Sequence, residues 1–228
     1  MKEIEQFIDL IKNNNKIVFI TEDTLSNQHI KNFMYIFNNK MLKEHTEEFY
    51  EYFYRNVNNN VKPNIIHQTI KKLEDKNKVS GIISFSIDGL YKRVKCKHLY
   101  EMVGNMNNFV CTKCKKKFTK KYAQVNTFKK CNVCGDIIRP DIVLQDEEIN
   151  LNLEQKCNKV IKDSNLIVII GCDLRQYKIN SLLKENRDKT IVVINEHPQG
   201  KLKGVNLVIK ENPITIFNII NKNIEKEV

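Results

Sequence analysis

The chain has 228 residues, and its 38 Lys and Arg against 27 Asp and Glu give a formal net charge of +11. This length accommodates one full α/β domain with an insertion and excludes two large independent domains. No apolar run approaches the roughly 18 to 20 residues that a membrane-spanning helix needs, and residues 1–15 have the pattern of an amphipathic helix, not of a secretory leader. We therefore expect a soluble cytoplasmic protein with no membrane partner.

Short β-branched runs recur along the chain and predict buried strands at 16–21, 80–86, 165–171, 190–195 and 205–209. Apolar runs without alternation indicate that both faces of a strand are covered, as in a parallel sheet between two layers of helices. Helical periodicity supplies such layers at 154–163, 178–187 and 213–225. The fold class that follows is α/β, with a Rossmann-like doubly wound parallel sheet whose ligand crevice lies at the carboxyl ends of its strands.

A long stretch at 27–78 has helical patterning between the first two predicted strands, most clearly at 44–55 and 63–77. We expect a helical insertion there, over the strand ends. The aromatic residues of 44–55 recur along a helix, which is typical of core packing and gives no reason to infer base stacking.

Four cysteines, Cys111, Cys114, Cys131 and Cys134, form two C-x2-C pairs separated by sixteen residues. Two such pairs present four thiolates, which complete a closed tetrahedral zinc site and leave no open position for chemistry. We expect a structural zinc module at 105–140. The other cysteines, Cys96, Cys157 and Cys172, have no pairing pattern, which favours a reducing compartment.

Between Cys111 and Cys134 there are eight lysines and no acidic residues, so the module keeps about +6 after a zinc-thiolate centre of −2. Such a surface is suited to phosphate or to an acidic protein. It is also what a solvated face looks like in a chain that is rich in lysine throughout. Another protein is the partner that we favour, and nucleic acid is possible but not favoured.

Four further segments stand in a fixed order around the zinc cysteines: PNIIHQTIKKLED at 63–75, SIDGL at 86–90, CGDIIRPDIV at 134–143 and GCDL at 171–174. In this order and spacing the chain resembles the sirtuins, a family of NAD-dependent protein deacylases. The resemblance implies a single sirtuin-like domain. Its Rossmann-like part comprises 1–26, 79–104 and 141–228, and its smaller lobe consists of the zinc ribbon and the helical insertion.

The resemblance implies NAD as a cofactor, but most residues expected to bind it are changed. The family's glycine-rich GAGxS turn corresponds to Thr21–Ser26, where the glycines are gone and Glu22 and Asp23 stand instead. Each carboxylate about 4 Å from a phosphate would cost roughly 4 kcal/mol at an effective dielectric near 20. The family's TQN becomes 84–86 (SFS), and the serine of GTSL becomes Asp173. The positions that match are Ser26, Asp88 and Asn195.

The family's catalytic histidine, in E-L-H-G, corresponds to Val103, which cannot carry a proton. His98 lies nearby in the sequence and is a possible substitute for the missing histidine. A lone histidine at the start of a predicted strand is, however, more often a structural residue. The family's substrate loop VxFGE becomes 143–147 (VLQDE), and Tyr91 replaces the histidine after IDGL. We therefore expect no catalytic residue, and NAD binding becomes doubtful.

Three hypotheses follow. The chain is a catalytically degenerate sirtuin that acts as a binding or regulatory pseudoenzyme; or it is an active NAD-dependent protein deacylase or ADP-ribosyl transferase with an atypical site. In the third, acids at the strand ends hold a cation or a basic ligand, namely Glu22, Asp23, Asp88 and Asp173.

Overall fold

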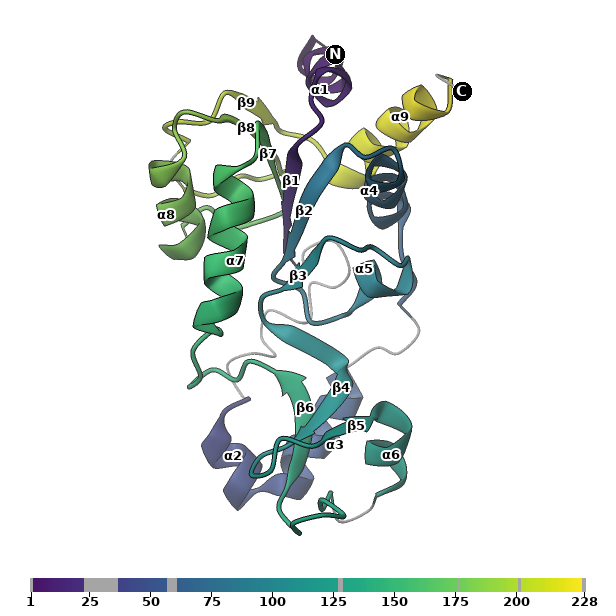
Figure 1. Ribbon diagram of the computed structural model, residues 1–228, viewed down its shortest axis with the longest axis vertical. Coiled ribbons are helices and arrows are strands. Elements are labelled where there is room, and N and C mark those ends of the chain that lie inside the picture. Colours follow the sequence, from purple (N-terminus) through teal and green to yellow (C-terminus); the bar gives the residue numbers. More distant parts are fainter. Residues whose placement is uncertain are drawn as a thin grey trace.

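The structure, a computed structural model, describes residues 2–22, 37–56, 61–126, 129–175, 177–200 and 202–226. It has a main lobe built on a six-stranded sheet and a small lobe built on a three-stranded sheet (Figure 1). No helix within the described ranges combines the length and the apolar character needed to cross a membrane.

The main sheet is entirely parallel and has the strand order β3-β2-β1-β7-β8-β9. Its strands are β1 (Ile17–Thr21), β2 (Val79–Ser84), β3 (Leu99–Glu101), β7 (Leu166–Ile170), β8 (Thr190–Ile194) and β9 (Leu207–Ile209). The order reverses between β1 and β7, which is the point where an open α/β sheet opens a crevice beyond its strand ends. The predicted fold class is confirmed.

Both faces of this sheet are buried because helices cover each of them. Phe19 and Val168 face the core formed with α1 (Lys2–Asn13), α4 (Ile65–Asp75) and α9 (Pro213–Lys226). Val18 and Ile167 face the opposite core, formed with α7 (Leu151–Lys162) and α8 (Tyr177–Glu185). Successive strand residues thus enter different cores, which explains why the strands have apolar runs and not an alternating pattern.

The second predicted strand ends earlier than expected, at Ser84 and not at Ser86. The amide of Phe85 still donates to the carbonyl of Thr21, but the amide of Ser86 turns back to the hydroxyl of Ser84 at 3.2 Å. Because the serine hydroxyl accepts from this backbone amide, the amide does not continue the hydrogen bonding between the strands, and the strand ends here.

The small lobe contains the antiparallel sheet β5-β4-β6, made of β4 (Gly104–Cys111), β5 (Lys117–Thr119) and β6 (Ile138–Ile142). Its helices are α2 (Asn39–Glu44), α3 (Thr46–Asn56) and α6 (Lys120–Val125), and a short α5 (Leu90–Arg93) follows β2. The aromatic residues of α3 belong to its core as expected: Phe49 and Phe53 are fully buried and pack with Phe37 and Phe109.

The predicted helical insertion at 27–78 is divided between the two lobes. Helices α2 and α3 belong to the small lobe, but α4 buries Ile66, Ile70 and Leu73 in the core of the main sheet. The ammonium of Lys72 also donates to Asn221 on α9, at 2.9 Å. Amphipathic periodicity indicates that a helix buries one face, but it does not indicate against which partner.

Candidate functional site

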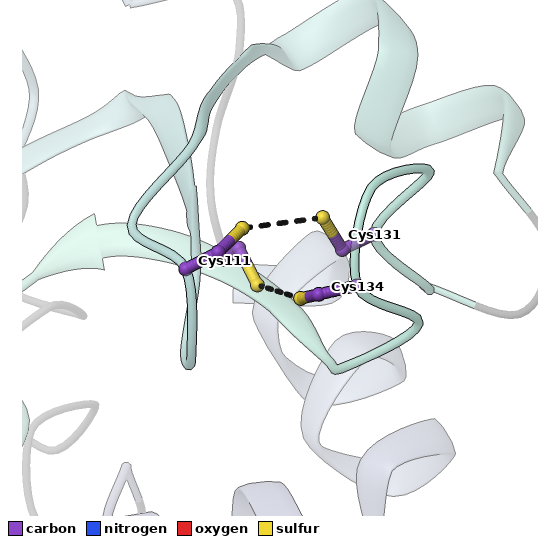
Figure 2. Close-up of side chains that lie close together, drawn as sticks. Cys111, Cys131 and Cys134 are labelled. Atoms are coloured by element: carbon purple, nitrogen blue, oxygen red, sulfur yellow. Dashed lines mark hydrogen bonds between the residues drawn. The ribbon is translucent and has the colours of Figure 1, made fainter.

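The four predicted zinc ligands converge at one end of the small lobe. Their ligand atoms all lie within 4.8 Å of one another, with Sγ–Sγ distances of 3.4 Å for Cys111 and Cys134 and 3.6 Å for Cys114 and Cys131. Figure 2 shows the sulfur atoms of Cys111, Cys131 and Cys134 pointing into one small space between two loops. Cys111 and Cys131 are buried, whereas Cys114 and Cys134 are exposed.

The two loops that carry these thiols have the same local geometry. Each C-x2-C pair is followed by a left-handed residue, Lys115 at φ 59° and Gly135 at φ 74°. The amide of that residue donates to the carbonyl of the first cysteine, at 3.2 Å for Lys115 and 3.0 Å for Gly135. The spacing of two residues therefore forms a tight turn that aims both thiols the same way.

The donor set fits zinc. With Zn–S bonds of about 2.3 Å, a tetrahedral site separates its sulfurs by about 3.8 Å, close to the two contacts above. All four cysteines are free thiols and not disulfides. Such a closed site of four thiolates would hold zinc as a structural element, with no position for a substrate.

A second cluster of polar groups lies at the carboxyl ends of β1, β7 and β8. A carboxylate oxygen of Glu22, directly after β1, accepts a hydrogen bond from the backbone amide of Asp173 at 3.0 Å. The Asp173 carboxylate in turn accepts from the guanidinium of Arg175 at 2.6 Å. Asn195 donates to the carbonyl of Cys172 at 3.1 Å. Two of the crevice residues singled out in the sequence, Asp23 and Ser26, lie outside the described residues.

Asp88, the third predicted cofactor-binding residue, lies between β2 and α5. Its side chain is buried and accepts from the backbone amide of Leu90 at 2.9 Å, which caps the first turn of α5. Its carbonyl accepts from the side chain of Asn107 at 3.0 Å. These contacts join Asp88 to α5 and β4, and its role in cofactor binding stays a prediction.

Val103 occupies the turn between β3 and β4. It is half-buried and packs against the core of the small lobe, and its carbonyl accepts from the amide of Val143 at 2.9 Å. The turn thus joins the two lobes at the position where the sirtuin pattern has its histidine.

None of the four histidines within the described ranges takes the place of Val103. His98 precedes β3, at the opposite end of the strand, and its ring contacts Glu74 at 3.1 Å. His67 is buried on α4 with its ring 4.5 Å from that of Tyr91; burial lowers its pKa to about 4, against the opposing charge of Asp88. His45 and His197 are exposed, on the small lobe and after β8.

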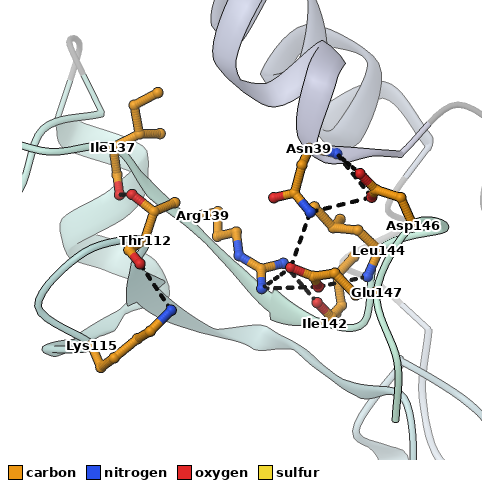
Figure 3. Close-up of polar contacts among 9 residues, drawn as sticks. All are labelled: Asn39, Thr112, Lys115, Ile137, Arg139, Ile142, Leu144, Asp146 and Glu147. Carbon is orange, nitrogen blue, oxygen red and sulfur yellow. Dashed lines mark hydrogen bonds and ion pairs between the residues drawn. The ribbon is translucent and has the colours of Figure 1, made fainter.

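The loop at 143–147 is fastened to its neighbours by acidic side chains (Figure 3). Asp146 accepts from the backbone amide of Asn39 at 3.0 Å and from its side chain at 3.2 Å. Glu147 accepts from the guanidinium of Arg139 at 2.8 Å and from the amide of Leu144 at 3.0 Å. Sequence reasoning identified these acids as departures from a substrate loop but missed their role as loop anchors; the partner of Asp146, Asn39, is 107 residues away.

The family model described as the Sir2 family matches residues 22–177, which is more than half of the chain. This chain belongs to the Sir2 family. A protein from Staphylococcus epidermidis named NAD-dependent protein deacetylase is 28% identical over 97% of this chain and 98% of its own length. A relative of the same name from Clostridium acetobutylicum is 30% identical over 75% of this chain and 71% of its own.

Solved sirtuin structures share the fold. One determined for work on sirtuin substrate affinity matches 96% of this chain and 98% of its own with a TM-score of 0.86 and 22% identity. Another, of Sir2 with a p53 peptide and NAD+, matches 98% of both chains with a TM-score of 0.81 and 21% identity. The sirtuin resemblance drawn from the sequence is therefore confirmed for family and fold.

Proposed function

We propose that this Sir2-family protein has lost NAD-dependent deacylation and acts in the cytoplasm as a binding or regulatory subunit for another protein. The observation that carries the proposal is Val103 at the position of the family's base. An aliphatic side chain accepts no proton, and loss of a positioned acid or base lowers a rate by roughly 100 to 10,000-fold. Of the described histidines, His98 lies at the wrong end of β3 and His67 is buried in the core.

The crevice at the strand ends supports the same proposal. Backbone amides are donors that anionic ligands use, and Glu22 already accepts from the amide of Asp173, in the loop between β7 and α8. The Glu22 carboxylate would oppose a pyrophosphate by roughly 4 kcal/mol at a separation near 4 Å and an effective dielectric of 20. The charge of the Asp173 carboxylate is offset by the guanidinium of Arg175. The negative charge of Glu22 supports our proposal that the crevice does not bind NAD.

A second candidate function is an active NAD-dependent deacylase or ADP-ribosyl transferase. The name NAD-dependent protein deacetylase carried by relatives along nearly the whole chain favours it. This function needs its base from elsewhere, either from a partner chain or from His29, which lies outside the described residues.

The two functions are separated by nicotinamide release. Zinc-loaded protein is incubated with NAD and a panel of acylated peptides, with the Staphylococcus epidermidis deacetylase as a positive control. The proposal predicts no release above the peptide-free background. Release within tenfold of the positive control would establish the second function.

A further inference from the structure

The zinc module presents a basic strip, which we define as the six lysines between residues 113 and 121. They follow the first zinc knuckle through β5 into the first turn of α6: Lys113, Lys115, Lys116, Lys117, Lys120 and Lys121. All are exposed except Lys120, which is half-buried. Figure 1 places β5 and α6 in the small lobe, away from the main sheet and from the strand ends of the crevice.

The charge of the basic strip is only partly offset by acidic side chains, such as Asp136 near Lys113. Residues 111–134 contain no Asp or Glu. Three ammonium groups donate to neutral oxygens: Lys115 to the carbonyl of Thr112 at 2.8 Å, Lys116 to the side chain of Asn132 at 3.1 Å and Lys120 to the side chain of Asn107 at 3.2 Å. Within the described part of the chain no ion pair involves Lys113, Lys115, Lys116, Lys117 or Lys121. The strip therefore attracts polyanions.

Two aromatic rings lie inside the strip in an unusual arrangement. Phe118 and Tyr122 are stacked, with ring centroids 4.8 Å apart and an interplanar angle of 22°. The other ring contacts given for described residues have angles of 35° or more. Both rings are half-buried, and the ammonium of Lys116 lies 5.6 Å from the Phe118 centroid. The hydroxyl of Thr119 caps α6 through the amide of Tyr122 at 3.2 Å, which fixes the pair.

We propose that the basic strip binds single-stranded nucleic acid, with phosphates on the lysines and bases against the Phe118–Tyr122 pair. Positively charged grooves combined with aromatic rings are what sequence-tolerant single-strand binding requires, since every base has a flat face to stack. An acidic peptide would form ion pairs with the lysines but would have no base to stack on the aromatic rings. This inference is independent of deacylase activity, because the strip shares no residue with the crevice.

The test is fluorescence anisotropy of labelled dT20 and rU20 with full-length, zinc-loaded protein. For about four phosphate contacts, affinity should fall on the order of 50-fold between 50 and 200 mM salt. The triple variant Lys116→Glu, Lys117→Glu, Lys121→Glu should bind at least tenfold more weakly. The matched control is Lys203→Glu, Lys210→Glu, Lys222→Glu on the main lobe, which changes the net charge equally and should alter affinity less than threefold.

The aromatic part has its own pair of variants. Tyr122→Ala should weaken binding several-fold, and Tyr122→Phe, which keeps a ring, should not; both must retain one zinc per chain. Equal weakening by the two lysine triples would overturn the proposal in favour of bulk charge, as would absent binding at 50 mM salt. Tighter binding to polyglutamate or to anionic vesicles than to dT20 and rU20 would overturn it in favour of an acidic protein or a lipid surface.

Discussion

Val103 lies between β3 and β4, half-buried against the small-lobe core, and its backbone bonds to Val143. A valine suits this position as a packing residue. The polar residues around the strand ends are likewise engaged within the chain: Glu22 with the Asp173 amide, Asp88 with α5, and Asn195 with Cys172. At the scale of single residues, groups at the expected cofactor positions serve the fold.

His67 gives a testable pH dependence. Burial lowers its pKa to about 4 in the folded protein, so the unfolded chain, with a pKa near 6.5, binds the proton first. The stability that neutral His67 contributes is therefore full above about pH 6.5 and is lost as the pH falls toward 4. Urea unfolding of wild type and His67→Gln between pH 7.5 and 4.5 measures it. We expect a shallower decline in the variant; parallel curves would contradict this assignment.

Arg139 tests the anchoring of the loop at 143–147. Its guanidinium is largely buried and donates to Glu147 and to the carbonyl of Ile142. Arg139→Ala leaves these acceptors unpaired and should lower the free energy of unfolding by about 2 kcal/mol. Arg139→Lys should fall between, since lysine has no fork for two acceptors. Urea midpoints measure both, with the exposed Arg187→Ala as a control that should not change. An unchanged urea midpoint for Arg139→Ala would show that this anchor does not stabilise the folded protein.

At the scale of elements, strands such as β1 and β7 were predictable because each is buried along its length and forms an apolar run. The edge strand β3, with the sequence LYE, is only half-buried and was not among the strands predicted from apolar runs. The small sheet carries no such signal. Its longest strand, β4, has the sequence GNMNNFVC and an irregular register, and only some of its residues are buried. Helix α4 belongs to the main lobe because it packs against α9. The sequence pattern of α4 itself does not indicate this partner.

The convergence of Cys111, Cys114, Cys131 and Cys134 was predictable from spacing, because each C-x2-C turn is local. The contact of Glu22 with Asp173 was not, since 151 residues separate the two. The same holds for Asn39 and Asp146, 107 residues apart. Comparison with the sirtuin pattern shows which positions of the sequence differ. The hydrogen bonds that the side chains at those positions form can be identified only in the folded structure.

The small lobe gives the prediction at this scale. Cys134→Ser removes one thiolate from the zinc site, and metal binding contributes on the order of 10 kcal/mol to small zinc domains. We expect loss of zinc and rapid proteolysis within 105–140, while the main lobe keeps its core. Zinc content and limited proteolysis measure this, with Cys96→Ser as the control. A Cys134→Ser protein that holds one zinc per chain and resists protease would contradict a structural site.

At the scale of the whole molecule, the chain keeps the elements that make up the sirtuin fold. The sheet order, the two covering layers of helices and the converging cysteines are all present. The basic strip lies on the small lobe, in β5 and α6, away from the strands of the main sheet (Figure 1).

Calorimetric titration of zinc-loaded protein with NAD and, separately, with ADP-ribose tests the loss of the cofactor site most directly. A variant that restores the glycine-rich turn and the base runs alongside it: Glu22→Gly, Asp23→Ala, Thr24→Gly and Val103→His. The account predicts no heat of binding for the wild type and measurable binding for the variant. Micromolar binding of NAD by the wild type would contradict it and would leave the source of the catalytic base as the question to answer.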